Sequence, residues 1–196
     1  MNLPTARFIS FILNPLLILV FLPFFLVFKT TGNVSTSIGW TIYTFLFLFL
    51  ILVFMVYGVW RGIFTDLDAS RRDQRTLLYI FSLCVGVVYI IGLFVFYAPI
   101  ILKVMAIGML MGVIIATFVN IWIKASIHTA TLSGLLMGLF LGYGGYFVLL
   151  FILIPILGQS RISLKRHTLR EIIVGWILGS LISLGIFTFL RIYIYK

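Results

Sequence analysis

The sequence predicts an all-α membrane protein, a polytopic helix bundle with six to seven transmembrane helices. Two observations predict this class. Hydrophobic residues make up 63% of the 196 residues and charged residues only 9%, a composition that a soluble globule with a polar shell cannot accommodate. The apolar residues also gather in runs of about 20, the length of a helix that crosses a hydrocarbon core of roughly 30 Å. We expect a single integral membrane domain over residues 1–196, in a multi-pass protein of the cell membrane.

Five apolar runs each have the length and the low charge of one membrane-spanning helix. They cover residues 8–28, 38–60, 77–98, 104–123 and 172–190. A further apolar stretch, residues 129–158, is too long for one comfortable crossing, and Gly142-Tyr143-Gly144-Gly145 in its middle indicates a turn. We therefore expect two shorter helices there, over residues 129–142 and 144–158, which makes seven helices in total. Six helices are the alternative, if this stretch is unbroken.

The division into seven helices places three polar segments on one side of the membrane, residues 61–75, 124–128 and 158–170. Together with the N-terminus, this side carries ten of the fourteen basic residues: Arg7, Arg61, Arg71, Arg72, Arg75, Lys124, Arg161, Lys165, Arg166 and Arg170. The positive-inside rule favours a cytoplasmic face, but a phosphate site would need cations there for its own reasons, so the orientation stays open. The net charge of +10 indicates contact with anionic head groups or an anionic substrate, and we recognise no nucleic-acid-binding module.

The residues able to carry chemistry are scarce and clustered. His128 and His167 are the only histidines, and Glu171 is the only glutamate. Histidine changes its charge near neutral pH, so it can act as a nucleophile or a general acid. The stretch from Ser160-Arg161 through His167 to Glu171 supplies a guanidinium that binds anions, a nitrogen nucleophile and a carboxylate to orient it. We interpret this stretch as a phosphate-handling site.

The same stretch, followed by Gly175-Trp176-Ile177-Leu178-Gly179, resembles the third signature block of the type 2 phosphatidic acid phosphatase superfamily. That superfamily includes lipid phosphate phosphatases and vanadium haloperoxidases. Its second block, usually Pro-Ser-Gly-His, is similar to Ala125-Ser126-Ile127-His128, and its first block is similar to the segment that ends at Arg75-Thr76. The resemblance spans residues 66–179, and its third block is the most specific part.

The resemblance implies a metal-independent hydrolase without a cofactor. In that mechanism His167 attacks phosphorus, His128 protonates the leaving oxygen, and Glu171 holds and polarises His167 from one turn along a helix face. Arg75 and Arg161 clamp the phosphate oxygens through charge-assisted hydrogen bonds. The implied substrate is a lipid phosphate or a polyprenyl diphosphate whose apolar tail stays in the bilayer. The oligomeric state stays open.

Four positions depart from the pattern of the superfamily. Asp68 stands where the first block has lysine, Thr76 replaces a proline, Ile127 replaces the glycine of the second block, and Glu171 replaces an aspartate. The missing lysine removes a phosphate ligand. We expect Lys124, four residues before His128, to compensate for it, and Ser126 to donate through its hydroxyl or amide.

Simpler interpretations stay open beside the enzymatic one. Thr168 and Glu171 have the spacing of a capping box, so Glu171 can serve only to start the last helix. Each histidine taken singly fits an interfacial residue satisfied by water or lipid. A non-catalytic membrane carrier or binder of anionic head groups is the alternative function.

Two further enzyme classes fit less well. A magnesium-dependent prenyltransferase could use Asp66 and Asp68, but the sequence has no second aspartate-rich loop. For the three acids Asp66, Asp68 and Asp73, which lie in one loop with Arg71, Arg72 and Arg75, we favour a salt-bridged loop. An intramembrane serine protease would need a Gly-x-Ser-Gly element beside the histidines.

Overall fold

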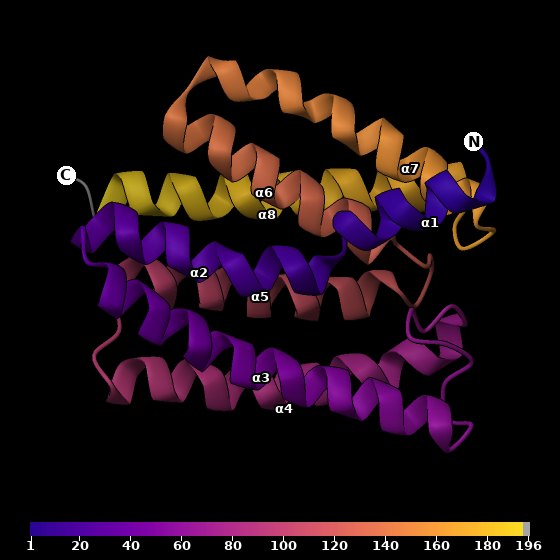
Figure 1. Cartoon of the computed structure of the whole chain (residues 1–196), viewed down its shortest axis with the longest axis horizontal. Coiled ribbons are helices and arrows are strands. Elements are labelled where there is room, and N and C mark those ends of the chain that lie inside the picture. Colours follow the sequence, from indigo (N-terminus) through magenta and orange to yellow (C-terminus); the bar gives the residue numbers. More distant parts are fainter. Residues whose placement is uncertain (194–196) are drawn as a thin grey trace. The chain divides into compact units, whose positions relative to one another are not determined.

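The computed structural model describes residues 1–193, apart from the side chains of Tyr143 and Tyr193. Over these residues the protein is all-α, which confirms the predicted class (Figure 1). Its elements are α1 (Leu3–Ile12), α2 (Pro15–Thr31), α3 (Val34–Trp60), α4 (Arg72–Val95), α5 (Ile100–Val119), α6 (Ile127–Tyr143), the 3₁₀ helix η1 (Gly145–Ile152), α7 (Leu153–Ser163) and α8 (Leu169–Tyr193).

Six helical segments in the described part of the chain are long and apolar enough to cross a membrane. They are Leu3–Thr31, Val34–Trp60, Arg72–Val95, Ile100–Val119, Gly145–Ser163 and Leu169–Ile192. A seventh apolar helix, Ile127–Gly142, is shorter. The protein is therefore a multi-pass membrane protein, as its composition predicts.

The first apolar segment contains a break that its hydropathy does not reveal. The predicted run over residues 8–28 is split into α1 and α2 at Leu13 and Asn14. Pro15 has no amide hydrogen and disfavours helical geometry in the residue before it, so the helix ends there and a new one begins. The Asn14 side chain supports the restart, because its Oδ1 accepts the backbone amide of Leu16 at 2.9 Å.

The stretch between α6 and α8 turns at the predicted place. Gly144 has φ +102°, a conformation that residues with a side chain rarely adopt, and α6 ends at Tyr143. After the turn the chain continues as η1 and then as α7, which extends to Ser163. The predicted division of this stretch into two helical segments is confirmed, and the alternative of one unbroken helix is wrong.

The chain divides into two compact units. The first consists of Met1–Ile18 and residues 122–193, and so holds α1, α6, η1, α7 and α8. The second covers Leu19–Ile121, with most of α2 and all of α3, α4 and α5. The prediction of a single membrane domain stays a prediction.

Each unit has its own apolar core. In the first unit the fully buried core residues come from α6 and α7: Leu132, Leu136, Ile154 and Leu157. Within this unit α6 lies along α8, and α1 lies along α7 (Figure 1). In the second unit, α2, α4, α5 and the loop before α5 contribute Val27, Leu93, Ala98, Leu102 and Ala106. The first unit contains every predicted site residue except Arg75.

Candidate functional site

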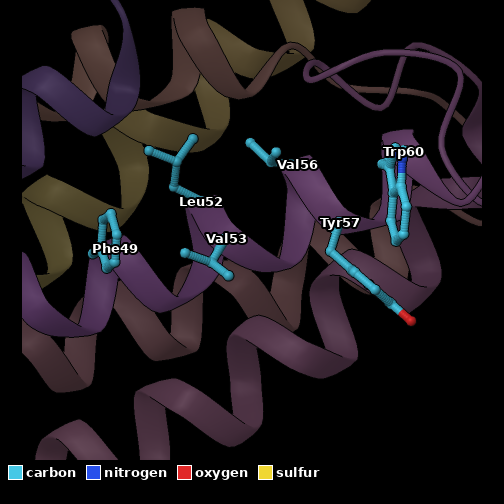
Figure 2. Close-up of a pocket in the computed structure, with 6 residues that line it drawn as sticks. All are labelled: Phe49, Leu52, Val53, Val56, Tyr57 and Trp60. Carbon is cyan, nitrogen blue, oxygen red and sulfur yellow. The ribbon is translucent and has the colours of Figure 1, made fainter.

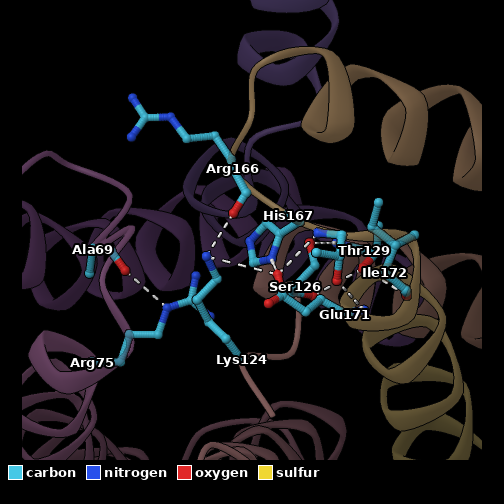
Figure 3. Close-up of polar contacts among 10 residues, drawn as sticks. Ala69, Arg75, Lys124, Ser126, Thr129, Arg166, His167, Glu171 and Ile172 are labelled. Carbon is cyan, nitrogen blue, oxygen red and sulfur yellow. Dashed lines mark hydrogen bonds and ion pairs between the residues drawn. The ribbon is translucent and has the colours of Figure 1, made fainter.

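The site is built where α6 and α8 begin. The backbone amide of Ser126, just before α6, donates to the carbonyl of Glu171 in the first turn of α8 at 3.0 Å. One turn further, Thr129 Oγ1 donates to the carbonyl of Ile172 at 3.3 Å (Figure 3). These contacts place both helix starts at the same end of the unit, so the two segments that carry the histidines are neighbours.

The close approach of the two helices depends on glycine. A Cβ atom on Gly175 would lie 2.5 Å from the carbonyl oxygen of Ser126 and 2.5 Å from Thr129 Oγ1. No real side chain fits at that distance, so glycine at this position lets the backbone of α8 approach the start of α6. Small residues commonly permit such close approach between membrane helices.

His167 and Glu171 form a short contact. His167 Nδ1 lies 2.7 Å from Glu171 Oε2, and the exposed fractions of the two side chains are 1% and 17%. A carboxylate only accepts hydrogen bonds, so Nδ1 is the donor in this contact. Whenever the imidazole is neutral, its lone pair is then on Nε2. His167 precedes the N-cap residue Thr168, so the pair forms across the start of α8. The expectation that the two residues would share a helix face was wrong, because His167 lies before the helix begins.

Glu171 also closes a capping box. Its Oε2 accepts the backbone amide of Thr168 at 3.2 Å, and the Glu171 amide lies 3.4 Å from Thr168 Oγ1. These are the reciprocal contacts of an S/T-x-x-E start. Glu171 thus makes the contact expected of a helix cap and the contact expected of a histidine partner, through one oxygen.

Lys124 brings a cation to the same carboxylate. Its Nζ donates to the carbonyl of Arg166 at 2.8 Å and lies 3.8 Å from Glu171 Oε2 (Figure 3). The exposed fractions of the Lys124 and Glu171 side chains are both 17%. A partly buried ammonium group therefore lies beside the His167 and Glu171 pair.

The second-block residues occupy the first turn of α6. Ser126 is fully buried and is the N-cap, with its Oγ 3.4 Å from the backbone amide of Thr129. His128 lies two residues after Ser126 in the same turn and is buried, with 8% of its surface exposed. The Ser126 amide is hydrogen-bonded to the Glu171 carbonyl, so His128 lies at the same end of the unit as His167.

Arg161 lies on α7 and is 2% exposed. Its Nη1 donates to Ser10 Oγ on α1 at 2.8 Å, and the neighbouring Ser160 Oγ donates to the carbonyl of Ala6 at 2.6 Å. Sequence reasoning identified Arg161 but missed Ser10. The only signal was the pair of small residues Ala6 and Ser10, one turn apart in α1.

Arg75 belongs to the second unit. It lies in the first turn of α4, is 2% exposed, and its Nε donates to the carbonyl of Ala69 at 3.0 Å. Ala69 has φ +45°, which turns its carbonyl within a tight loop. In that loop Asp66 Oδ1 accepts the backbone amide of Asp68 at 2.9 Å, so Asp66 serves the turn.

Asp73 forms a surface ion pair. Arg71 and Asp73 are 2.9 Å apart with side chains 63% and 64% exposed, in line with the expected salt-bridged loop. Over residues 1–193, apart from the two omitted side chains, no three His, Cys, Asp or Glu residues cluster as metal ligands would.

An apolar hollow lies in the second unit, along α3. Its lining residues all come from that helix: Phe49, Leu52, Val53, Val56, Tyr57 and Trp60 (Figure 2). None of these side chains carries a charge. The surface of the hollow is apolar and suits hydrocarbon, such as a lipid tail.

Comparison with known proteins returned no relatives: no family model, no curated protein and no solved structure matches this chain. The resemblance to the phosphatidic acid phosphatase superfamily therefore stays a prediction. Functional inference for this protein depends on the geometry of its own residues.

Proposed function

We propose that this membrane protein is a phosphatase that hydrolyses a lipid phosphate or an isoprenoid diphosphate through a phosphohistidine intermediate. The observation that carries the proposal is the 2.7 Å contact between His167 Nδ1 and Glu171 Oε2, with the ammonium group of Lys124 beside it. A proton held on Nδ1 leaves the lone pair on Nε2, which is the atom that attacks phosphorus. Glu171 stabilises the positive charge that develops on the imidazole ring.

The reaction has two steps. In the first, His167 Nε2 forms a bond to phosphorus as the bond from phosphorus to the lipid oxygen breaks, and His128 gives its proton to that oxygen. In the second, water attacks the phosphohistidine, the bond from nitrogen to phosphorus breaks, and His128 takes a proton from the water. Inorganic phosphate leaves, and both histidines return to their starting states.

Cations supply the electrostatic part of the catalysis. Phosphoryl transfer depends mainly on alignment and on stabilising the charge of the transferred group. Lys124 and Arg161 are the cations of the first unit that we assign to the phosphate oxygens, with Ser126 as a hydrogen-bond donor. The role of Arg75 as a phosphate ligand stays a prediction from the sequence. Because the His167 side chain is 1% exposed, neighbouring side chains must move when a head group binds.

The decisive experiment measures release of inorganic phosphate from phosphatidic acid in mixed micelles, with a chelator present. We expect turnover by the purified protein and none by His167→Ala. Thr188→Ala is the matched control, because its hydroxyl bonds only the carbonyl of Leu184 on its own helix. Undiminished release by His167→Ala would refute the proposed nucleophile.

A trapping experiment identifies the intermediate directly. The protein is exposed briefly to substrate with a radioactive phosphate and is quenched in alkali, in which phosphohistidine is stable. Peptide mapping should find the label on His167. Label on another residue, or turnover without any label on His167, would contradict the two-step mechanism.

A second candidate function is a carrier or binder of anionic lipid head groups that performs no chemistry. The observation in its favour is that Lys124 and Glu171 both have structural tasks, because Lys124 bonds the carbonyl of Arg166 and Glu171 closes the capping box. This function predicts saturable binding of phosphatidic acid without phosphate release. The same micelle assay distinguishes the two functions.

A further inference from the structure

Helices α1 and α7 are joined by polar contacts that the two-step reaction does not use. Two hydrogen bonds join the helices in register: Ser160 Oγ to the Ala6 carbonyl at 2.6 Å, and Arg161 Nη1 to Ser10 Oγ at 2.8 Å. The donors are adjacent on α7, and the acceptors are one turn apart on α1. The N-terminal helix is thereby joined to the arginine that we assign to phosphate binding.

The contact is buried. Ala6 and Ser160 are fully buried, Arg161 is 2% exposed and Ser10 is 8% exposed. A charged guanidinium out of water needs hydrogen-bond acceptors, since leaving it without them costs much free energy. The small size of Ala6 and Ser10 lets α1 approach closely enough for Ser10 to be such an acceptor.

The other face of α1 is of a different kind. Phe8, Phe11 and Ile12 are 64%, 67% and 50% exposed, so this face is largely hydrocarbon, with Thr5 and Arg7 exposed at its edges. It suits contact with lipid. The polar contacts between α1 and α7 are therefore confined to the small, buried face that holds Arg161.

The first apolar segment is longer than one crossing requires, and it is broken after α1. The segment from Leu3 to Thr31 has 29 residues, which would extend about 43 Å as one helix, well beyond a hydrocarbon core of roughly 30 Å. The 17 residues of α2 extend about 25 Å by themselves, which is close to a crossing. This leaves α1 available for a task other than spanning.

We propose that α1 is a component of the phosphate site and that Ser10 is the residue that positions the Arg161 guanidinium for the phosphate of the substrate. Arginine has five N–H donors in a rigid plane, so fixing Nη1 to Ser10 fixes the direction of the others. A guanidinium held in this way loses less conformational freedom when a phosphate binds. This inference rests on the proposed function through the assignment of Arg161 as a phosphate ligand.

The test compares three variants of the full-length protein in the phosphatidic acid assay. Ser10→Ala removes the acceptor, Ser10→Thr keeps a hydroxyl, and Thr5→Ala changes an exposed side chain elsewhere on α1 as the matched control. We expect Ser10→Ala to raise KM and the inhibition constant of inorganic phosphate roughly tenfold, the size expected for a lost hydrogen bond to a charged group. We expect kcat to change less, and both Ser10→Thr and Thr5→Ala to resemble the unmodified protein.

Thermal unfolding of each variant accompanies the kinetics. If Ser10→Ala does not fold, Ser10→Cys replaces it, because a thiol has similar size and is a weak acceptor. Unchanged KM and unchanged phosphate inhibition in a folded variant that lacks the hydroxyl would overturn the inference. Tighter phosphate binding would also overturn it, because α1 would then shield Arg161 and not position it.

Titration with inorganic phosphate separates this inference from the proposed function. If the unmodified protein binds phosphate without turnover, the enzymatic proposal fails, and weaker binding by Ser10→Ala still supports a positioned Arg161. Equal binding by both proteins overturns the inference alone. Absence of phosphate binding in the unmodified protein overturns both.

Discussion

Replacing Gly179 by alanine tests how tightly α6 and α8 pack. A Cβ atom at this position would overlap the carbonyl oxygen of Ala130 and the hydroxyl of Ser133 on the facing helix. The helices must separate to make room, and separation breaks the bond from Ser133 Oγ to the carbonyl of Trp176, now 3.0 Å. The bond from Thr129 Oγ1 to the helix α8 lengthens with it.

The expected cost follows from these contacts. Overpacking of a close contact typically costs about 1–3 kcal/mol. Each hydrogen bond lost between membrane helices costs about 0.6 kcal/mol on average, and two are affected. We therefore expect Gly179→Ala to lower the free energy of unfolding by about 2–4 kcal/mol.

Reversible unfolding in mixed micelles, with an increasing fraction of ionic detergent, measures this change. The matched control is Gly185→Ala on the same helix, because a Cβ atom there has nothing within 4 Å. Alanine is the better helix former, so the control should be neutral or stabilising by up to about 1 kcal/mol. Equal stability of Gly179→Ala and Gly185→Ala would refute the close packing of α6 against α8.

Three further variants test the site and its loops. Glu171→Gln should keep the capping box with Thr168 but lower phosphate release by roughly a hundredfold, with the unfolding curve little changed; an equal rate would remove Glu171 from the mechanism. Lys124→Met should raise KM for phosphatidic acid at least severalfold, since it removes a cation from the site, and an unchanged KM and kcat would exclude it as a phosphate ligand. Lys165 has φ +55°, so Lys165→Gly should raise the free energy of unfolding by about 0.5–1 kcal/mol, whereas Lys165→Ala, which keeps the strain, should not; equal unfolding curves would show that this conformation carries no strain.

Hydropathy predicts the helices well and their ends less well, for a physical reason. Apolar runs indicate which residues lie in hydrocarbon, but a helix continues into water wherever its polar residues tolerate it. The run predicted from residue 77 begins as α4 at Arg72, because polar residues such as Gln74 extend the helix beyond the apolar run. The run predicted from residue 38 begins as α3 at Val34, where Asn33 Oδ1 accepts the amide of Thr36 at 2.9 Å.

The part of the site that lies close in sequence was predictable, and the part built by tertiary contact was not. Glu171 follows His167 by four residues, so short-range geometry alone can bring them together. Arg161 and Ser10 are 151 positions apart, and a serine in an apolar helix gives no sign of its partner. The bond from Lys124 to the Arg166 carbonyl is also long-range, although the order of the polar segments did place both residues on one side.

The two tasks of Glu171 are physically coupled. Its Oε2 accepts from His167 Nδ1 at 2.7 Å and from the Thr168 amide at 3.2 Å, and Lys124 Nζ lies 3.8 Å away. The cap fixes the carboxylate at the start of α8, where the positive end of the helix dipole favours a negative charge. A carboxylate fixed in this way also fixes the imidazole ring, so the residue that starts the helix determines which nitrogen of His167 carries the lone pair. A capping box and a catalytic dyad are therefore compatible here, and a variant that keeps the cap but removes the charge is the one that separates them.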